Sequence, residues 1–301
     1  MQLHISTGIK ESLLAWAEGF DYAVFLDSCQ SQVDRYGKYE FILGVADRET
    51  DTCQTWEEVT QKIGEGWWFG SLSYDAKNTF EPNLSTQNPK AIPFPELLFF
   101  RAETVIFQRK GSDTIESYPS YSIHLAEGRT LPELSVKLET PFQSNFTPEE
   151  YQETVEALRQ HIYAGDCYEI NLSQHYQARA EISSPAALWR QLTQVSPTPF
   201  SAFCRFRDTF LLSASPERFL QLEGDRLITQ PIKGTVRRSN DPEEDRQLSQ
   251  RLRHSQKEKA ENVMIVDLSR HDLYRSSTVN GVRVPHLFEV QSFAKVHHLV
   301  S

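Results

Sequence analysis

The 301-residue sequence has few cysteines, no long apolar run and no excess of basic residues. Its four cysteines, Cys29, Cys53, Cys167 and Cys204, contain no C-x-x-C pair and do not have the pattern of a disulfide framework. We interpret them as buried or idle thiols in a reducing compartment. No stretch approaches the apolar length of a membrane-spanning helix, and the first residues lack the pattern of a secretory signal. These absences predict a soluble, cytoplasmic protein with no membrane partner.

The charge balance disfavours partners that bind a basic surface. Lysine and arginine number 31 and aspartate and glutamate 41, which gives a formal net charge of −10. Nucleic acids and anionic membranes bind basic faces, so this composition disfavours both. A small anionic substrate is compatible with it, because a few local cations or a bound metal can reverse the field inside a pocket.

Several catalytic signatures are also absent. The sequence has no G-x-S-x-G, Walker A or G-x-G-x-x-G motif, which disfavours a hydrolase elbow, a phosphate-binding loop and a dinucleotide site. It has no H-x-H or H-E-x-x-H spacing that would suggest zinc.

Residues 1–140 have the pattern of an N-terminal α+β region. Runs rich in β-branched and aromatic residues predict strands at 23–27, 39–46, 67–75 and 96–108. The polar, proline-rich segment 78–96 predicts a loop, and residues 124–146 predict a linker.

Residues 147–301 form the second predicted domain. Thr147 as N-cap, Pro148 and Glu150 predict a helix start with a capping box, and Gly165 is placed to end that helix. We expect further helices at 185–195 and from Asp241 through 270, and strands at 168–180, 201–207, 209–214, 218–229 (with a turn at Gly224-Asp225) and in the tail 284–301. The elements together predict an α+β fold with long antiparallel sheets covered by helices.

Lys233 lies between a residue that restricts the backbone and one that frees it. Pro231 fixes φ and Gly234 permits close approach, so this segment predicts a shaped turn that can aim a side chain. Free lysine titrates near pH ~10.4, so burial or cationic neighbours are needed to produce a nucleophilic amine. A solvated surface cation is the alternative interpretation. Glu217 follows Ser215-Pro216 at the end of an apolar strand, where the strand pattern does not require a carboxylate.

Two further polar sites can be interpreted either as functional or as ordinary structural positions. Glu261 lies in a largely apolar helical stretch, where a carboxylate is either exposed or a ligand for a hard cation such as Mg²⁺. His297 and His298 are adjacent in an alternating strand, so one should face the core or a pocket and the other should face away.

Six blocks in a fixed order carry a family resemblance. They are IYAGDCYEINLSQ (162–174), SPTPFSAF (196–203), SASPERFL (213–220), TQPIKGTVRR (229–238), KEKAENVMIVDLSRHDLYR (257–275) and VHHLVS (296–301). From Thr147 onward the chain resembles the chorismate-utilising enzymes, which include anthranilate synthase component I, aminodeoxychorismate synthase component I, and the isochorismate and salicylate synthases. The segments FLDS (25–28) and FGSLSYD (69–75) extend the likeness into the N-terminal half.

The resemblance implies a fold and a metal-assisted site. The fold is of the anthranilate synthase component I type, with two large antiparallel β-sheets flanked by helices and an active site between the sheets. By position, Glu261 matches a carboxylate that holds Mg²⁺ against the ring carboxylate of the substrate, chorismate. Glu217 matches a general acid/base beside the departing C4 hydroxyl.

The resemblance also implies a branch of the family. Lys233 matches the lysine that distinguishes aminodeoxychorismate (para-aminobenzoate) synthases, whose PIKGT replaces the PIAGT of anthranilate synthases. Gly234, Thr235 and His298 match the substrate pocket. Isochorismate and salicylate synthases carry a lysine where this chain has Glu169, which disfavours that branch.

The implied reaction is the amination of chorismate to 4-amino-4-deoxychorismate, on the route to para-aminobenzoate and folate. The Lys233 amine would add to C2 while the C4 hydroxyl leaves, and ammonia would then attack C4 and expel the lysine. A separate glutamine amidotransferase subunit (component II) would supply the ammonia. Anthranilate synthase component I activity is the alternative. Ser28 and the SPTPF segment match regions that bind tryptophan in some relatives, and purely structural contacts are the preferred interpretation there.

Motifs that follow HHLVS in the family do not occur in these 301 residues. They are a segment resembling PGGSITGAPK, a second Mg²⁺-binding glutamate, a glycine-rich loop and an arginine for carboxylate binding. We therefore expect a fold that is incomplete at its C-terminus, with one carboxylate holding Mg²⁺ weakly. Two hypotheses follow, an enzyme subunit that aminates chorismate and a truncated, non-catalytic chorismate-binding remnant.

Overall fold

The computed structural model describes residues 8–81, 83, 92–120, 126 and 128–301. By its contacts the chain divides into two units. The larger contains the described residues of Met1–Thr86, Pro95–Leu131 and Pro185–Ser301, and the smaller those of Gln87–Phe94 and Pro132–Ser184. The predicted division into domains 1–140 and 147–301 stays a prediction. No helix in the described part of the chain is long and apolar enough to cross a lipid bilayer.

Helices and antiparallel strands make up the described chain, which confirms the predicted α+β class. The helices are α1 (Ile9–Ala17), α2 (Trp56–Lys62), the 3₁₀ turn η1 (Tyr74–Ala76), α3 (Lys77–Phe80), α4 (Pro148–Ala164), α5 (Pro185–Val195), α6 (Pro242–His254) and α7 (Gln256–Tyr274). The strands are β1 (Tyr22–Asp27), β2 (Tyr39–Ala46), β3 (Thr52–Cys53), β4 (Trp68–Leu72), β5 (Leu97–Arg101), β6 (Thr104–Arg109), β7 (Ile115–Tyr118), β8 (Val136–Leu138), β9 (Gln143–Ser144), β10 (Tyr176–Gln177), β11 (Ala180–Ile182), β12 (Phe200–Phe206), β13 (Thr209–Ser215), β14 (Arg218–Glu223), β15 (Arg226–Gln230), β16 (Ile232–Arg237), β17 (Glu289–Ser292) and β18 (Val296–Val300).

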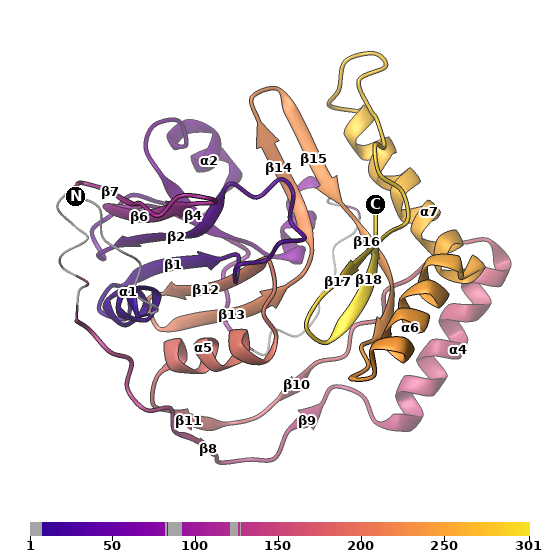
Figure 1. Cartoon of the computed structure of the whole chain (residues 1–301), viewed down its shortest axis with the longest axis horizontal. Helices are drawn as coiled ribbons and strands as arrows, with labels where there is room; N and C mark the ends of the chain where they lie inside the picture. Colours follow the sequence, from indigo (N-terminus) through magenta and orange to yellow (C-terminus); the bar gives the residue numbers. More distant parts are fainter. Residues whose placement is uncertain (1–7, 82, 84–91, 121–125, 127) are drawn as a thin grey trace. The chain divides into compact units, whose positions relative to one another are not determined.

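A six-stranded antiparallel sheet organises the larger unit (Figure 1). Its strand order is β13-β12-β1-β2-β6-β7. Strand β1 is central, and its Phe25 is opposite Leu43 of β2 on one side and Phe203 of β12 on the other. This pairing joins strands that are about 180 positions apart in the sequence, so the sheet forms only when the N-terminal region and residues 200–215 fold together.

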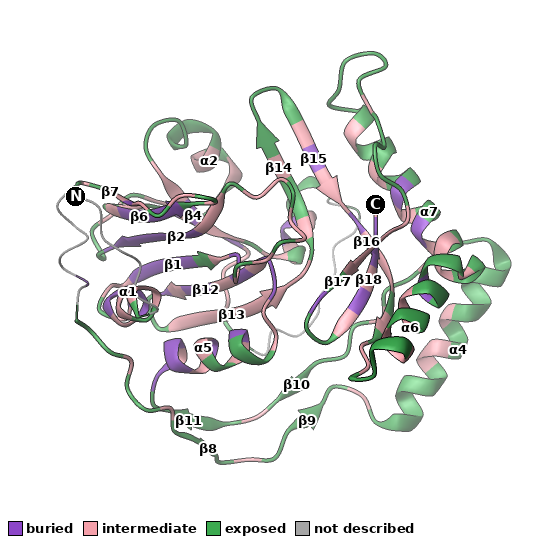
Figure 2. Cartoon of the chain, viewed as in Figure 1, coloured by how far each residue is buried: buried purple, intermediate pink, exposed green. Residues whose placement is uncertain are grey.

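Both faces of this sheet are covered, and its central strands are buried along most of their length (Figure 2). On one face Phe25 packs with Trp189 of α5 in the main apolar cluster, which also contains side chains of α1. Tyr22 is an odd number of positions away and so faces the opposite side, where it stacks on Phe100 of the three-stranded sheet β3-β5-β4 at 5.4 Å between ring centroids. Each such aromatic side chain contributes about 1.5–3 kcal/mol by leaving water.

A second structural layer follows the hairpin β14–β15 in the sequence. Strands β16, β18 and β17 form a three-stranded antiparallel sheet, and α6 and α7 pack against β16 and β18. Asp241 caps α6 by accepting a hydrogen bond from the Glu243 N–H, with Pro242 at the first helical position as predicted. This layer carries every residue that the sequence singles out as a candidate site, except Glu217, which directly precedes β14.

The helix expected to run unbroken from Asp241 through 270 is instead two helices. Ser255 ends α6 with an extended backbone and at the same time caps α7, because its hydroxyl accepts a hydrogen bond from the Glu258 N–H. A serine that offers this local bond competes with helix continuation. The expectation of one helix was therefore wrong.

Two predicted strands also differ from the structure. The run 96–108 is not one strand, because the chain leaves the small sheet after Arg101 and enters the large sheet at Thr104. The Ala102 N–H bonds to the carbonyl of Trp67, directly before β4 of the small sheet, and the Glu103 N–H to the carbonyl of Val45 in β2 of the large sheet. The expected strand 168–180 is reduced to β10 and the start of β11, which pair only in two-stranded ribbons with β9 and β8.

The smaller unit has few buried side chains. Its helix α4 has the predicted capping box between Thr147 and Glu150, and Gly165 ends it in the left-handed region at φ 83°. No side chain of α4 is fully buried. The short strands β8 and β9 lie in the segment that the sequence predicts as a linker.

Candidate functional site

Lys233 and Gly234 form a bulge in β16. Ile232 is paired with Val300 and Thr235 with His298, so three steps along β16 match two along β18. Gly234 has φ +91°, and an added Cβ would lie 2.9 Å from Glu258 Oε2, so only glycine fits both the backbone and the space. A bulge changes the direction of the neighbouring side chain. The predicted shaped turn is thus a strand bulge, with the Lys233 side chain partly buried.

The Glu217 carboxylate is held at the start of the same strand. Its Oε1 accepts a hydrogen bond from the Ile232 N–H at 3.1 Å, and its own N–H donates to Ser215 Oγ at 3.2 Å. Ile232 is the residue directly before Lys233. The structure therefore brings the predicted acid/base to within one residue of the predicted nucleophile along β16, while Glu217 itself stays exposed.

Thr235 and His298 are joined across β16 and β18. The Thr235 hydroxyl and His298 Nδ1 lie 2.8 Å apart, and Phe293 packs against the imidazole edge at 5.3 Å between centroids. Burial lowers the pKa of His298 below its ordinary value, and a hydrogen bond with the Gly234 backbone opposes part of that shift. The partly buried imidazole is thus biased toward its neutral form and ties β18 to the bulge.

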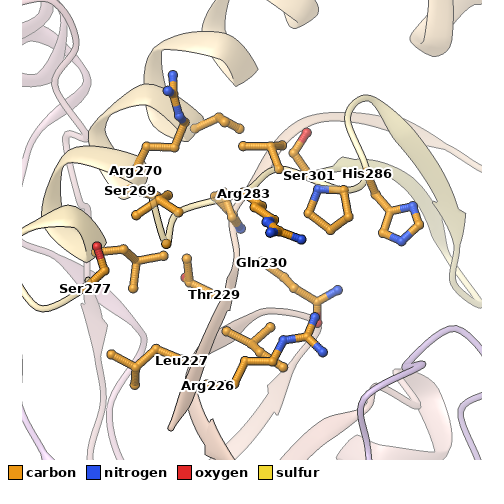
Figure 3. Close-up of a pocket in the computed structure, with 18 of the residues that line it drawn as sticks. Arg226, Leu227, Thr229, Gln230, Ser269, Arg270, Ser277, Arg283, His286 and Ser301 are labelled. Atoms are coloured by element: carbon orange, nitrogen blue, oxygen red, sulfur yellow. The ribbon is translucent and has the colours of Figure 1, made fainter. Parts of the chain in front are cut away.

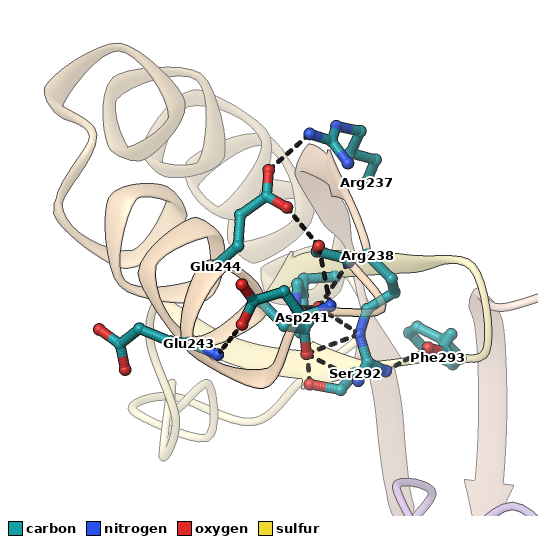
Figure 4. Close-up of polar contacts among 10 residues, drawn as sticks. Arg237, Arg238, Asp241, Glu243, Glu244, Ser292 and Phe293 are labelled. Carbon is teal, nitrogen blue, oxygen red and sulfur yellow. Dashed lines mark hydrogen bonds and ion pairs between the residues drawn. The ribbon is translucent and has the colours of Figure 1, made fainter.

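His297 faces the opposite side of β18, as the alternation predicts. It is buried, with Nδ1 2.8 Å from Ser292 Oγ and Nε2 3.1 Å from Asp245 Oδ1. Asp245 of α6 also accepts hydrogen bonds from the Arg238 guanidinium, and that interaction is the main cause of its strongly lowered pKa. Arg238 also donates to the Phe293 carbonyl (Figure 4). His297 is therefore a satisfied structural histidine that fixes β18 to α6.

Glu261 lies on α7, one helical turn after Glu258. Lys257 Nζ lies 3.0 Å from Glu261 Oε1 and 3.2 Å from Glu258 Oε1, so the two carboxylates already share a cation. Oxygen donors of this kind are those that Mg²⁺ prefers. Among the residues that the structure describes, no three His, Cys, Asp or Glu side chains gather into a metal-binding group.

Asn262 anchors this part of α7 to β18. Its amide donates to the Leu299 carbonyl at 3.3 Å, and its Oδ1 accepts from Ser301 Oγ at 2.6 Å. It is 1% exposed. A buried asparagine beside Glu261 in an apolar helical run is a signal that the sequence contains, but pattern reasoning does not distinguish it from an exposed polar residue.

A large cavity lies beside, and not at, this cluster. It encloses about 820 Å³ between β15, the C-terminal half of α7 and the segment 276–286. Arg226, Gln230 and Arg283 are among its lining side chains (Figure 3). None of the six predicted site residues lines it, although Pro231 and Val300, which flank the cluster, do.

The region from residue 17 to residue 301 matches the family model of chorismate binding enzymes. The chain belongs to this family. All six predicted site residues lie within the matched range and in the larger unit. Their individual roles stay predictions.

Similar family members come from several bacteria. The chain is 39% identical over 242 residues to aminodeoxychorismate synthase component 1 of Salmonella typhimurium and 42% identical over 244 residues to that of Escherichia coli, in each case over 79% of this chain and 53% of the relative. It thus spans about half the length of these relatives. In fold it is similar to anthranilate synthase component I of Streptococcus pneumoniae, with TM-score 0.70 and 22% identity, over 93% of this chain and 65% of that one.

Proposed function

We propose that this chain is the chorismate-binding part of an aminodeoxychorismate synthase component I, which converts chorismate and ammonia into 4-amino-4-deoxychorismate and water in the cytoplasm. The identity to relatives of that name supports the assignment. The chain spans about half of their length, so the activity of this chain by itself is part of the proposal.

One observation carries the proposal: the Glu217 carboxylate is bonded to the backbone of the residue that directly precedes Lys233. The Glu217 Oε1 atom bonds to the N–H of Ile232, and Lys233 follows on the same strand. A two-step substitution requires a nucleophile and an acid/base group at the same site, and this bond supports that pairing.

The proposed reaction proceeds through a bond to Lys233. The neutral amine forms a C–N bond at C2 of chorismate, both ring double bonds shift, and the C4 hydroxyl leaves as water with a proton from Glu217. Ammonia then forms a bond at C4, both double bonds shift back, and the C2–N bond to Lys233 breaks, while the new C4 ammonium returns a proton to Glu217. Two easier displacements thus replace one difficult one.

The remaining site residues bind and orient the substrate. Gly234 allows close approach at the bulge, and Thr235 and His298 form a polar pair beside it. Glu261 would hold Mg²⁺, whose charge neutralises the ring carboxylate of chorismate and fixes its position. A glutamine amidotransferase subunit is the proposed source of ammonia in the cell, and no membrane or nucleic acid takes part.

The test replaces the proposed nucleophile. Purified protein is given chorismate, Mg²⁺ and an ammonium salt, which bypasses the amidotransferase, and aminodeoxychorismate is measured. We expect Lys233→Ala to lower the amination rate by about 100-fold or more, because both steps need the amine. Lys295→Ala, which removes an exposed lysine from the β17–β18 turn, is the matched control and should keep the parent rate.

Two outcomes contradict the proposal in different ways. Equal rates for Lys233→Ala and the parent remove the covalent lysine. A folded parent chain that binds chorismate but makes no product favours the non-catalytic binding hypothesis.

A further inference from the structure

A nearly buried ion pair holds the residue next to Glu217. The Arg218 guanidinium donates from Nη2 to Asp34 Oδ1, and the two side chains are 9% and 5% exposed. Removing either partner would leave a charge buried without compensation, which native structures avoid. The pair therefore fixes the start of β14 firmly.

The other donors of Arg218 are also used. Nε donates to Gln230 Oε1 at 2.9 Å, and Nη1 donates to Gln221 Oε1. The guanidinium carbon Cζ lies 4.9 Å from the ring centroid of Phe200. Only a planar fork of this shape makes these contacts together, so lysine would not reproduce them.

Arg218 and Glu217 together attach the start of β14 to two points on the segment where β15 ends and β16 begins. Arg218 bonds to Gln230, the last residue of β15, and Glu217 bonds to Ile232, the first residue of β16. Between these two points lies Pro231, which has no N–H and a fixed φ. The backbone next to Glu217 is thus held by Arg218, in addition to the bond between the Glu217 N–H and Ser215 Oγ.

We propose that Arg218 is a positioning residue for Glu217, and that its pair with Asp34 makes the segment 31–37 part of the support of the site. This inference rests on the proposed function for its catalytic meaning. Asp34 Oδ1 also accepts hydrogen bonds from the Tyr36 and Gly37 N–H groups, at 3.1 and 3.0 Å. Lys110 donates to the Asp34 carbonyl at 3.2 Å. The segment that supplies Asp34 is therefore itself held in place.

The test observes the Glu217–Ile232 hydrogen bond directly, without turnover. The amide resonance of Ile232 is followed by NMR at a fixed pH of about 7, and the shift measured is the change that the substitution Glu217→Gln causes in it. In the parent we expect a clear shift, because the substitution replaces the carboxylate that accepts the Ile232 N–H. In Arg218→Gln we expect less than about half of the parent shift, and faster hydrogen exchange at Ile232.

Two further variants make the result decisive. Arg218→Lys keeps the charge but loses the fork, so it should fold and give an intermediate shift; if Arg218→Gln does not fold, this variant decides. Lys10→Gln breaks another partly buried pair, with Asp27, and should leave the Ile232 shift unchanged. A full parent-sized shift in a folded Arg218 variant, or no shift in the parent, overturns the inference.

A kinetic measurement separates this inference from the proposed function. If the chain aminates chorismate, Arg218→Lys should lower kcat by about 10-fold with an unchanged KM, because misplacing a catalytic group slows the chemical steps. An equal change in kcat and KM would contradict the positioning role. A chain without turnover contradicts the proposed function alone, since the Ile232 shift still decides the role of Arg218.

Discussion

At the scale of single residues, His298 combines partial burial with a polar partner on the neighbouring strand. Burial lowers its pKa, so the native state binds fewer protons than the unfolded chain at mildly acidic pH. Its contribution to stability is therefore complete above the ordinary histidine pKa of about 6.5 and is lost as the pH falls from there through the native pKa. Near neutral pH the imidazole is neutral and keeps its bond to Thr235.

The first prediction concerns this pKa. We expect the His298 ring resonances to titrate with a midpoint below about 6.5, because the charged form loses water in the folded protein. The measurement is a pH titration by NMR, with His298→Gln used to assign the signals. A midpoint at or above the ordinary value would show that burial does not dominate at this residue.

Single residues differ in how well the sequence predicts them. Lys233, Gly234 and the opposite orientation of His297 and His298 follow from local rules, namely proline and glycine conformations and strand alternation. The pair of Arg218 with Asp34 does not, since the two residues are 184 positions apart. The sequence around each of these two residues resembles that around charged residues on a protein surface. They become buried only when distant segments pack together.

At the scale of elements, the segments with clear end signals agree with the structure. Helix α4 begins at its capping box, and α5 covers the predicted range 185–195. One failure is local, because the Ser255 cap divides the helix expected from Asp241 through 270. The other two depend on which strands are available as partners. The chain at Ala102-Glu103 changes sheets because its N–H groups find acceptors on both. Residues 168–180 have strand-forming side chains, but only two-stranded ribbons form there.

The contact between α6 and β18 gives a prediction at this scale. Asp245 has a lowered pKa because Arg238, the Ser239 N–H and His297 all donate to its carboxylate. A lowered native pKa contributes stability that is present above the unfolded value of about 3.9 and is lost as the pH falls through the native one. We expect Asp245→Asn to lower Tm at neutral pH, with a difference from the parent that shrinks below about pH 4.

Thermal unfolding by circular dichroism at a series of pH values measures this effect. Glu243→Gln is the matched control, because it removes an exposed carboxylate of α6 whose partners, among the described residues, are Arg246 and Gln247 on its own helix. Such surface pairs contribute little, so the control should melt near the parent. Equal melting of Asp245→Asn and the control would mean that the network does not hold β18 to α6.

At the scale of the whole molecule, the predicted site residues lie at the start of a hairpin, on two strands and on a helix that are separated along the sequence. All six predicted site residues lie in the range that matches chorismate binding enzymes, and their assembly into one site stays a prediction. What the family blocks could not give is how the residues are supported. Asp34 of the N-terminal region and Asn262 of α7 both hold elements of the site, and neither has a local signal of that role.

Binding of chorismate with Mg²⁺ is the prediction that tests this assembly as a unit. A ligand that binds only the folded chain stabilises it by about 2.7 kcal/mol at a free concentration of 100 times Kd, so chorismate and Mg²⁺ together should raise Tm. Glu261→Gln should remove the part of that rise that depends on Mg²⁺, because an amide is a weaker ligand than a carboxylate. The measurement is a Tm series against Mg²⁺ at fixed chorismate.

The control for this series is Asp267→Asn, which removes an exposed carboxylate from the same helix and should respond to Mg²⁺ like the parent. Superimposable Mg²⁺ series for Glu261→Gln and the parent would contradict the metal role of Glu261. The rise in Tm does not require turnover, so it tests the binding of chorismate and Mg²⁺ separately from the amination reaction. A chain that binds chorismate and Mg²⁺ but does not aminate chorismate gives the rise in Tm and no product. If Glu261→Gln loses the Mg²⁺-dependent rise and the control keeps it, the metal is assigned to α7, whatever the amination rate.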